Sequence, residues 1–270
     1  ETVAVYSTAD KEALHTLLAD EAVCIGPAKS TESYLNMNAV LSAAVLTGSE
    51  AIHPGFGFLS ENSKFATMCE EVGIKFIGPS GSVMDMMGDK INARAQMIKA
   101  GVPVIPGSDG EVHSAEEALK VADRIGYPVM LKASAGGGGK GIRKVERAED
   151  LVPAFESAST EAKAAFGNGA MYLERVIYPA RHIEVQILAD QFGHVVHLGE
   201  RDCSLQRNNQ KVLEESPSVA IGKTIRDQIG SAAVRAAESV GYENAGTIEF
   251  LYDEGKGEFY FMEMNTRVQV

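Results

Sequence analysis

Tryptophan is absent from the sequence, and cysteine is scarce. The three cysteines, Cys24, Cys69 and Cys203, lie far apart and form no Cys-x-x-Cys pair, which argues against a disulfide framework or a zinc site. No run approaches the roughly 18 apolar residues of a membrane-spanning helix, and the amino terminus carries no signal-peptide pattern. These absences predict a cytoplasmic protein that does not bind a membrane.

Basic residues are also in the minority. The 25 Lys and Arg residues against 37 Asp and Glu residues give a net charge of −12, which opposes binding to nucleic acid or to anionic lipid. The remaining composition is ordinary: 45% of the 270 residues are hydrophobic and 23% are charged. A chain of this length and composition is expected to form two or three domains with real hydrophobic cores.

The first 80 residues predict a doubly wound parallel α/β unit. Short Val- and Ile-rich runs bounded by Gly, Pro or Ser predict strands at 2–6, 22–25, 51–53 and 74–77. Helical spacing between the second and third runs predicts a helix around 37–44, with Ser30 or Thr31 as its cap and Gly48 as its stop. Because a strand at Thr2 has no preceding βα unit, we expect the first strand of this unit and its glycine turn to be missing.

The rest of the chain predicts three further parts. Residues 81–106 read as a helical linker with a helix at 90–100, and residues 107–176 as a lid with strands at 128–132, 142–145 and 171–175 and a helix at 148–165. Residues 177–270 alternate as antiparallel strands do, at 181–188, 194–202, 246–253 and 258–265, with one helix at 224–240. The expected domains are therefore 1–80, 81–106, 107–176 and 177–270.

A glycine run interrupts the lid hairpin. It comprises Gly136, Gly137, Gly138, Gly139, Lys140 and Gly141. Such a run is typical of a backbone that closes over a triphosphate, but it is equally typical of a flexible hairpin tip. It matches neither the Walker loop nor the dinucleotide fingerprint. Lys132, at the end of the preceding strand, favours a phosphate clamp.

Two glutamates near the carboxyl end predict a metal site. A hairpin that turns at 254–257 with Asp253 opposite Phe259 would place Glu249 opposite Glu263. Paired carboxylates repel each other unless a cation or proton lies between them. With Asn265 two residues further on the same face, this oxygen set suits Mg²⁺ or Mn²⁺. A solvated sheet face is the alternative interpretation.

Other polar segments are less specific by themselves. The segment 53–62 follows a strand at its carboxyl end, where open α/β sheets bind ligands, but a tight loop with aromatic packing would look the same. The charged segment 200–207 is more often a solvated loop than a site. His182 alone is more often a structural histidine than a ligand contact.

Taken jointly, these segments resemble the biotin carboxylases. The resemblance rests on HPGFGFLSEN at 53–62, MGDK at 87–90, KASAGGGGKG at 132–141, RHIEVQIL at 181–188, ERDCSLQR at 200–207, AGTIEFL at 245–251 and EMNTRVQV at 263–270. It implies the ATP-grasp fold: a preceding α/β domain, a hinged glycine-loop lid and a larger carboxyl-terminal domain.

The resemblance also implies a role for individual residues. The ATP-binding set would be Lys90, Lys132, Gly136, Gly137, Gly138, Gly139, Gly141, Glu174, Arg175, Ile177, His182, Gln206 and Asn209. Glu249, Glu263 and Asn265 would bind two Mg²⁺ or Mn²⁺ ions. The bicarbonate and biotin pocket, and hence catalysis, would depend on Lys211, Arg267, Gln269 and Val270. In Asn209, Arg175 and Phe56 the sequence departs from the family's usual histidine, lysine and tyrosine.

The implied activity is carboxylation of biotin on a carrier protein, with ATP and bicarbonate and through carboxyphosphate. The implied partners are the biotin carboxyl carrier protein and carboxyltransferase subunits, in a homodimeric parent enzyme of acetyl-CoA carboxylase and fatty-acid synthesis. The alternatives are the front end of a pyruvate or propionyl-CoA carboxylase, another ATP-grasp ligase such as carbamoyl-phosphate synthetase, and an inactive nucleotide-binding module. Because the family continues past Val270 with a catalytic glutamate and a biotin-binding arginine, we expect this chain alone to be inactive.

Overall fold

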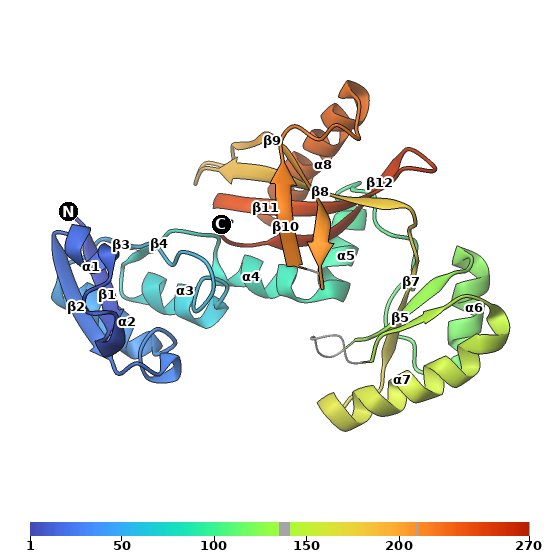
Figure 1. Cartoon of the computed structure of the whole chain (residues 1–270), viewed down its shortest axis with the longest axis horizontal. Coiled ribbons are helices and arrows are strands. Elements are labelled where there is room, and N and C mark those ends of the chain that lie inside the picture. Colours follow the sequence, from blue (N-terminus) through green and yellow to red (C-terminus); the bar gives the residue numbers. More distant parts are fainter. Residues whose placement is uncertain (135–140, 209, 270) are drawn as a thin grey trace.

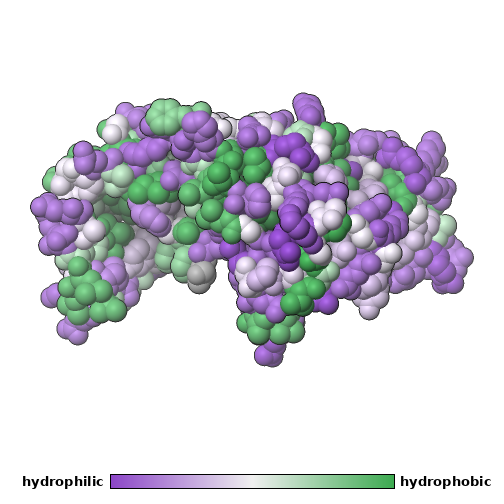
Figure 2. Space-filling view, turned by 90° about the horizontal axis from the view of Figure 1, so that it is seen from above, coloured by the Kyte–Doolittle hydropathy of each residue, from purple (hydrophilic) through white to green (hydrophobic). Residues whose placement is uncertain are grey.

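The computed structural model describes residues 1–134, 141–208 and 210–269. Figure 1 shows three units along the long axis of the molecule. The amino-terminal unit lies at one end, the lid lies at the other, and the carboxyl-terminal sheet lies between them with α4 and α5 beside it. On the face shown in Figure 2, hydrophilic residues predominate and hydrophobic ones form scattered patches.

The amino-terminal unit contains the four parallel strands that the sequence predicted. They are β1 (Val3–Ser7), β2 (Glu21–Gly26), β3 (Ala51–Ile52) and β4 (Lys75–Phe76), but they form two separate two-stranded sheets, β1–β2 and β3–β4. Helices α1 (Leu14–Leu18), α2 (Met37–Leu46) and α3 (Ser63–Glu71) connect them, together with the short 3₁₀ turns η1 (Thr8–Asp10) and η2 (Ser30–Glu32). Its core gathers around Phe65, Cys69 and Phe76.

The predicted cap of the helix around 37–44 is wrong. The Asn36 side chain accepts a hydrogen bond from the Ala39 amide and caps α2, whereas Ser30 begins the separate turn η2. Asparagine is as good a cap as serine, so composition alone could not choose between them. Gly48 follows the helix end with a positive φ of 65°, which suits glycine.

The lid packs around a core of its own, whereas the connector contributes Met87 and Met97 to the core of the carboxyl-terminal unit. The connector contains α4 (Gly81–Gly88) and α5 (Lys90–Lys99). The lid contains α6 (Ala115–Ile125), β5 (Val129–Ala133), β6 (Arg143–Val145), η3 (Ala148–Asp150), α7 (Leu151–Phe166) and β7 (Met171–Arg175), with strand order β6-β5-β7. The lid core includes residues from α6, α7 and the three strands, among them Leu131, Leu151 and Leu173. Helix α6 was not predicted from the sequence.

The carboxyl-terminal unit is an antiparallel sheet of five strands with one long helix. Its elements are β8 (Ala180–Ala189), β9 (Val195–Arg207), β10 (Gln210–Glu215), α8 (Lys223–Val240), β11 (Asn244–Asp253) and β12 (Glu258–Asn265), in strand order β10-β9-β8-β11-β12. Ile183 and Ile248 belong to the core that this sheet shares with α8. Among the described residues, no helix combines the length and apolar character needed to cross a membrane.

The β11–β12 hairpin confirms the predicted opposition of Glu249 and Glu263, but by a different register. Near the turn Asp253 lies opposite Glu258, so the expected pairing with Phe259 is wrong by one residue. An irregularity between Glu249 and Phe250 shifts the register by one, because Phe250 pairs with Phe261 while Glu249 pairs with Glu263. Met262 is the extra residue of this β-bulge.

Candidate functional site

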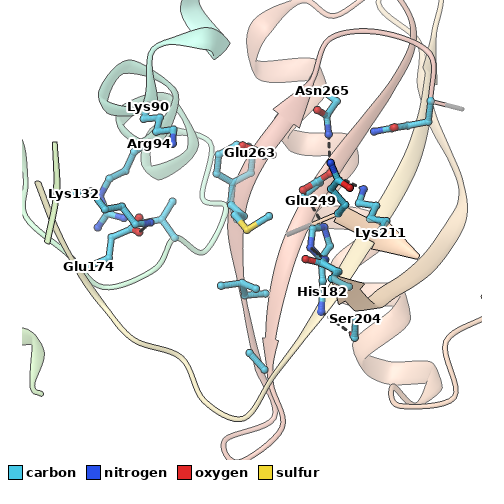
Figure 3. Close-up of a pocket in the computed structure, with 18 of the residues that line it drawn as sticks. Lys90, Arg94, Lys132, Glu174, His182, Ser204, Lys211, Glu249, Glu263 and Asn265 are labelled. Atoms are coloured by element: carbon cyan, nitrogen blue, oxygen red, sulfur yellow. Dashed lines mark hydrogen bonds and ion pairs between the residues drawn. The ribbon is translucent and has the colours of Figure 1, made fainter. Parts of the chain in front are cut away.

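A cavity of about 1190 Å³ lies between the lid and the carboxyl-terminal sheet. The predicted site residues that line it are Lys90, Lys132, Glu174, His182, Gln206, Lys211, Glu249, Glu263, Asn265, Arg267 and Gln269. In Figure 3, Lys90, Lys132 and Glu174 lie on one side of the pocket, and Lys211, Glu249 and His182 lie on the other. Residues separated by almost 180 positions in the sequence therefore meet around one space.

The period of two in the β strands explains why one sheet face is polar. Alternate residues of a strand point to opposite faces, so Ile183 and Ile248 pack in the core while their neighbours Glu184 and Glu249 share the other face. Strand pairing then extends a charged row across four strands. The row runs Arg201, Glu184, Glu249, Glu263 on β9, β8, β11 and β12.

Glu249 is the centre of this row. Its Oε1 accepts hydrogen bonds from Lys211 Nζ and from Asn265 Nδ2, both at 2.8 Å. Its Oε2 lies 2.9 Å from His182 Nε2, an ion-pair distance without the alignment of a directed hydrogen bond. His182 Nδ1 in turn lies 2.9 Å from Gln206 Nε2. Burial raises the pKa of Glu249, but His182 and Lys211 outweigh it and lower that pKa to about 2.

Glu263 behaves in the opposite way. Its side chain reaches the solvent of the open cavity, yet desolvation by the cavity walls and then the facing Glu249 carboxylate raise its pKa, against the opposing charge of Lys90. The repulsion between these two neighbouring carboxylates is relieved when a cation or a proton lies between them. The side-chain oxygens of Glu249, Glu263 and Asn265 are of the kind that Mg²⁺ and Mn²⁺ prefer, but Asn265 turns its Nδ2 toward Glu249 and its Oδ1 toward Arg267.

Two partners of the predicted residues were not foreseen from the sequence. Glu184 is fully buried and accepts hydrogen bonds from both Lys211 Nζ and Arg201 Nε. Burial opposes the charge of Lys211, but its contacts with Glu184 and Glu249 raise its pKa overall. The alternation from His182 to Glu184 could have revealed Glu184, whereas Arg201 required the pairing of β8 with β9.

The wall of the cavity opposite the sheet carries cationic side chains from both the lid and the connector. Lys132 on β5 donates to Glu174 on β7, and the Tyr172 hydroxyl donates to the same carboxylate at 2.9 Å. Lys90 begins α5, and Arg94 lies one turn further along that helix, also beside the cavity. Arg94 was not predicted, although the i, i+4 spacing from Lys90 places both on one helix face.

Some predicted residues lie away from the cavity or outside the described part. Arg175 donates to the Tyr260 hydroxyl at 3.0 Å and lies over that ring, and neither it nor Ile177 is among the cavity-lining residues. Gly141 is described, with a φ of 69°. Gly136, Gly137, Gly138, Gly139, Asn209 and Val270 lie outside the described residues. The roles of all these residues remain predictions.

Family models match nearly the whole chain. The model of the biotin carboxylase N-terminal domain matches residues 1–84, and the model of the carbamoyl-phosphate synthase L chain ATP-binding domain matches residues 89–270. The chain belongs to the biotin carboxylase family. The ATP-grasp fold expected from the resemblance is thereby confirmed.

Individual relatives of the biotin carboxylase family support the same assignment. The chain is 56% identical to biotin carboxylase 1 of Bacillus subtilis, over 100% of this chain and 60% of that relative. It is 54% identical to a pyruvate carboxylase subunit of Methanothermobacter thermautotrophicus, over 100% of this chain and 55% of that relative. The chain thus spans little more than half the length of these relatives.

Solved structures of the family match equally well. A Campylobacter jejuni biotin carboxylase–β-γ-ATP complex is 54% identical, with a TM-score of 0.89, over 99% of this chain and 60% of that one. The biotin carboxylase domain of a Hydrogenobacter thermophilus 2-oxoglutarate carboxylase, in complex with MgADP, ADP and bicarbonate, is 51% identical. Its TM-score is 0.86, over 100% of this chain and 59% of that one.

Proposed function

We propose that this chain is the nucleotide- and bicarbonate-binding part of an enzyme that carboxylates biotin on a carrier protein. The observation that carries the proposal is the cavity with Lys90 and Lys132 on one wall and the Glu249–Glu263 pair on the other. In the proposed reaction, the γ-phosphoryl group of ATP passes to bicarbonate and gives carboxyphosphate. Carboxyphosphate then breaks down to CO₂ and phosphate, and N1 of biotin attacks the CO₂ as its proton passes to the phosphate.

The side chains that line the cavity suit phosphoryl transfer. Phosphoryl transfer depends mainly on positioning and on electrostatic stabilisation, and the cavity offers cations and carboxylates in place of a nucleophile. Lys90 and Lys132 would neutralise phosphate oxygens, while Lys211, Arg267 and Gln269 would hold bicarbonate and biotin.

The remaining site roles follow the family. Glu174, Arg175, Ile177, His182, Gln206 and Asn209 would contact the nucleoside. Glu249, Glu263 and Asn265 would hold Mg²⁺ or Mn²⁺, whose charge would screen that of the phosphates when bound. Val270 would belong to the bicarbonate pocket.

The pathway is a further part of the proposal. We place the parent enzyme in acetyl-CoA carboxylase, with a biotin carboxyl carrier protein and carboxyltransferase subunits as partners, a homodimeric state, a cytoplasmic location and a role in fatty-acid synthesis. A pyruvate or propionyl-CoA carboxylase is the alternative, since one relative of the chain belongs to a pyruvate carboxylase.

The test combines binding with turnover. Calorimetry should detect ATP or ADP binding that requires Mg²⁺, and its absence from folded protein would reject the proposal. Because we expect this chain alone to be inactive, phosphate release is measured on the longer parent enzyme, where release that depends on bicarbonate and biotin would support the proposal. Release that requires ammonia in place of biotin would indicate a carbamoyl-phosphate synthetase. Magnesium-dependent binding without release would leave this chain a nucleotide-binding module.

A further inference from the structure

The segment 53–62 has no role in the site described so far, yet it reaches that site. Glu61, from this segment, accepts hydrogen bonds through Oε1 from the Thr266 amide at 3.2 Å and through Oε2 from Arg267 Nε at 3.1 Å. These residues are more than 200 positions apart. The amino-terminal unit therefore touches the end of β12 at the arginine that the proposed function assigns to bicarbonate.

The local fold holds Glu61 in place. The Asn62 amide donates to the Leu59 carbonyl at 3.1 Å, and the Asn62 side chain caps α3 by accepting from the Phe65 amide at 2.9 Å. Leu59 and Ser60 are buried. Because the residues on both sides of Glu61 are fixed by packing and capping, its carboxylate extends from a rigid turn.

The other contacts of Arg267 complete its orientation. Nη1 donates to Gln269 Oε1 at 3.1 Å, and Nη2 donates to Asn265 Oδ1 at 3.3 Å. Among these side-chain acceptors in the described structure, Glu61 alone carries a charge. Arginine recognises planar oxyanions through a rigid fork of donors, so the partner of Nε determines how the fork faces the cavity.

We propose that Glu61 is a positioning residue that orients the Arg267 guanidinium for bicarbonate, so that the amino-terminal unit completes an anion site in the segment that follows β12. This inference rests on the proposed function of Arg267. If Glu61 acted only through its charge it would oppose bicarbonate binding, because a carboxylate beside an anion site repels the anion. Removal of the Glu61 charge should therefore strengthen bicarbonate binding if Glu61 acts only by its charge, and weaken it if Glu61 positions Arg267.

The experiment compares Glu61→Gln with Glu71→Gln in the full chain. Both substitutions remove one negative charge from the amino-terminal unit, but Glu71 lies at the exposed end of α3. Sodium bicarbonate is titrated in the presence of MgADP at constant ionic strength, and the Nε–Hε resonance of Arg267 is followed by ¹⁵N NMR. The Arg267→Lys variant assigns that resonance by its disappearance.

We expect Glu61→Gln to move the Arg267 resonance before any bicarbonate is added and to weaken bicarbonate binding roughly five- to tenfold. Glu71→Gln should change neither. Unchanged or tighter bicarbonate binding in Glu61→Gln would overturn the inference, even if its melting temperature fell, because a purely structural contact would alter stability alone. Absence of any bicarbonate response in the unsubstituted chain would overturn the proposed bicarbonate site, and this inference with it.

Discussion

Lys132 gains its importance from where β5 ends. Its side chain pairs with Glu174 at the edge of the cavity, so an incoming phosphate would compete with that carboxylate for the ammonium group. Lysine is a strongly hydrated point charge that can exchange partners readily. The ion pair with Glu174 therefore holds the Lys132 ammonium group beside the proposed phosphate site.

We expect Lys132→Ala to weaken binding of MgATP by about 1.5–3 kcal/mol, the usual range for a charge-assisted contact. Lys120→Ala provides a matched control, because Lys120 is an exposed lysine on α6 of the same lid. Calorimetry of both variants measures the difference. Equal affinities would show that Lys132 does not contact the phosphates.

Substitution of Glu263 should have opposite effects on the stability of the protein and on metal binding. Its folded-state pKa is raised, first by desolvation and then by Glu249, so its ionised form is disfavoured in the folded chain. We expect Glu263→Gln to stabilise the metal-free protein at pH 7 by roughly 0.2–1 kcal/mol, the range for like charges across a strand pair, and to weaken Mn²⁺ binding.

The pH dependence checks the cause of that gain. A raised folded pKa destabilises the protein above that pKa, and the penalty vanishes once the carboxyl is protonated in both folded and unfolded states. The advantage of Glu263→Gln should therefore shrink as the pH falls and disappear below the ordinary pKa of 4.5. Denaturant unfolding from pH 8 to pH 4 measures it. A gain that persisted at pH 4 would contradict the electrostatic explanation.

Strand β8 carries Glu184, which connects Arg201 and Lys211 through ion pairs. Glu184 is fully buried and pairs with Lys211 and Arg201, and loss of one partner from a buried ion pair leaves the others uncompensated. We expect Glu184→Gln to destabilise the protein by about 3 kcal/mol. Glu214→Gln, on the half-exposed side of Arg201, should cost less than about 1 kcal/mol. Similar shifts in the urea midpoint for both variants would show that the buried ion pairs of Glu184 contribute no more to stability than the exposed one of Glu214.

The elements that the sequence predicted share a clear periodicity. The strand at 258–265 was predicted with the same bounds as β12, because it joins a run of aromatic residues to an alternating end from Met262 to Asn265. Helix α6 was missed, although Ser114 and Glu117 have the spacing of a capping box. The Ser114 hydroxyl accepts from the Glu117 amide, while the Glu117 carboxylate accepts from the His113 amide. The edge strand β10 is largely exposed and has no such pattern.

The site was predictable where its residues lie on one strand, and unpredictable where strands or units meet. The alternation from Glu263 to Asn265 is local, but the β-bulge at Met262 changes the register without a mark in the sequence. Likewise, the pairing of Arg201 with Glu184 depends on the register between β8 and β9. Glu61 meets Arg267 only after the amino-terminal unit packs against the sheet.

At the scale of the whole molecule, the cavity separates two independent cores. Lys132 and Glu174 project from the lid, whose core contains Leu131 and Leu173. Glu249 and Glu263 project from the sheet that packs on α8. Each core can open by itself in the absence of a ligand that spans the space between them. A nucleotide bound to both walls should therefore suppress the opening of both cores.

We predict that nucleotide with Mg²⁺ protects both cores together against hydrogen exchange. A ligand present at 100 times its Kd stabilises the folded state by about 2.7 kcal/mol, and a ligand bound to both walls shares that gain between them. Exchange should therefore slow in β5 and β7 of the lid and in β11 and β12 of the sheet, but not in β1 and β2 at the far end. The Lys132→Ala variant should lose the protection in both places at the same nucleotide concentration. Protection confined to the lid would show that the nucleotide does not reach Glu249 and Glu263. The assignment of the sheet wall to the nucleotide site would then be wrong.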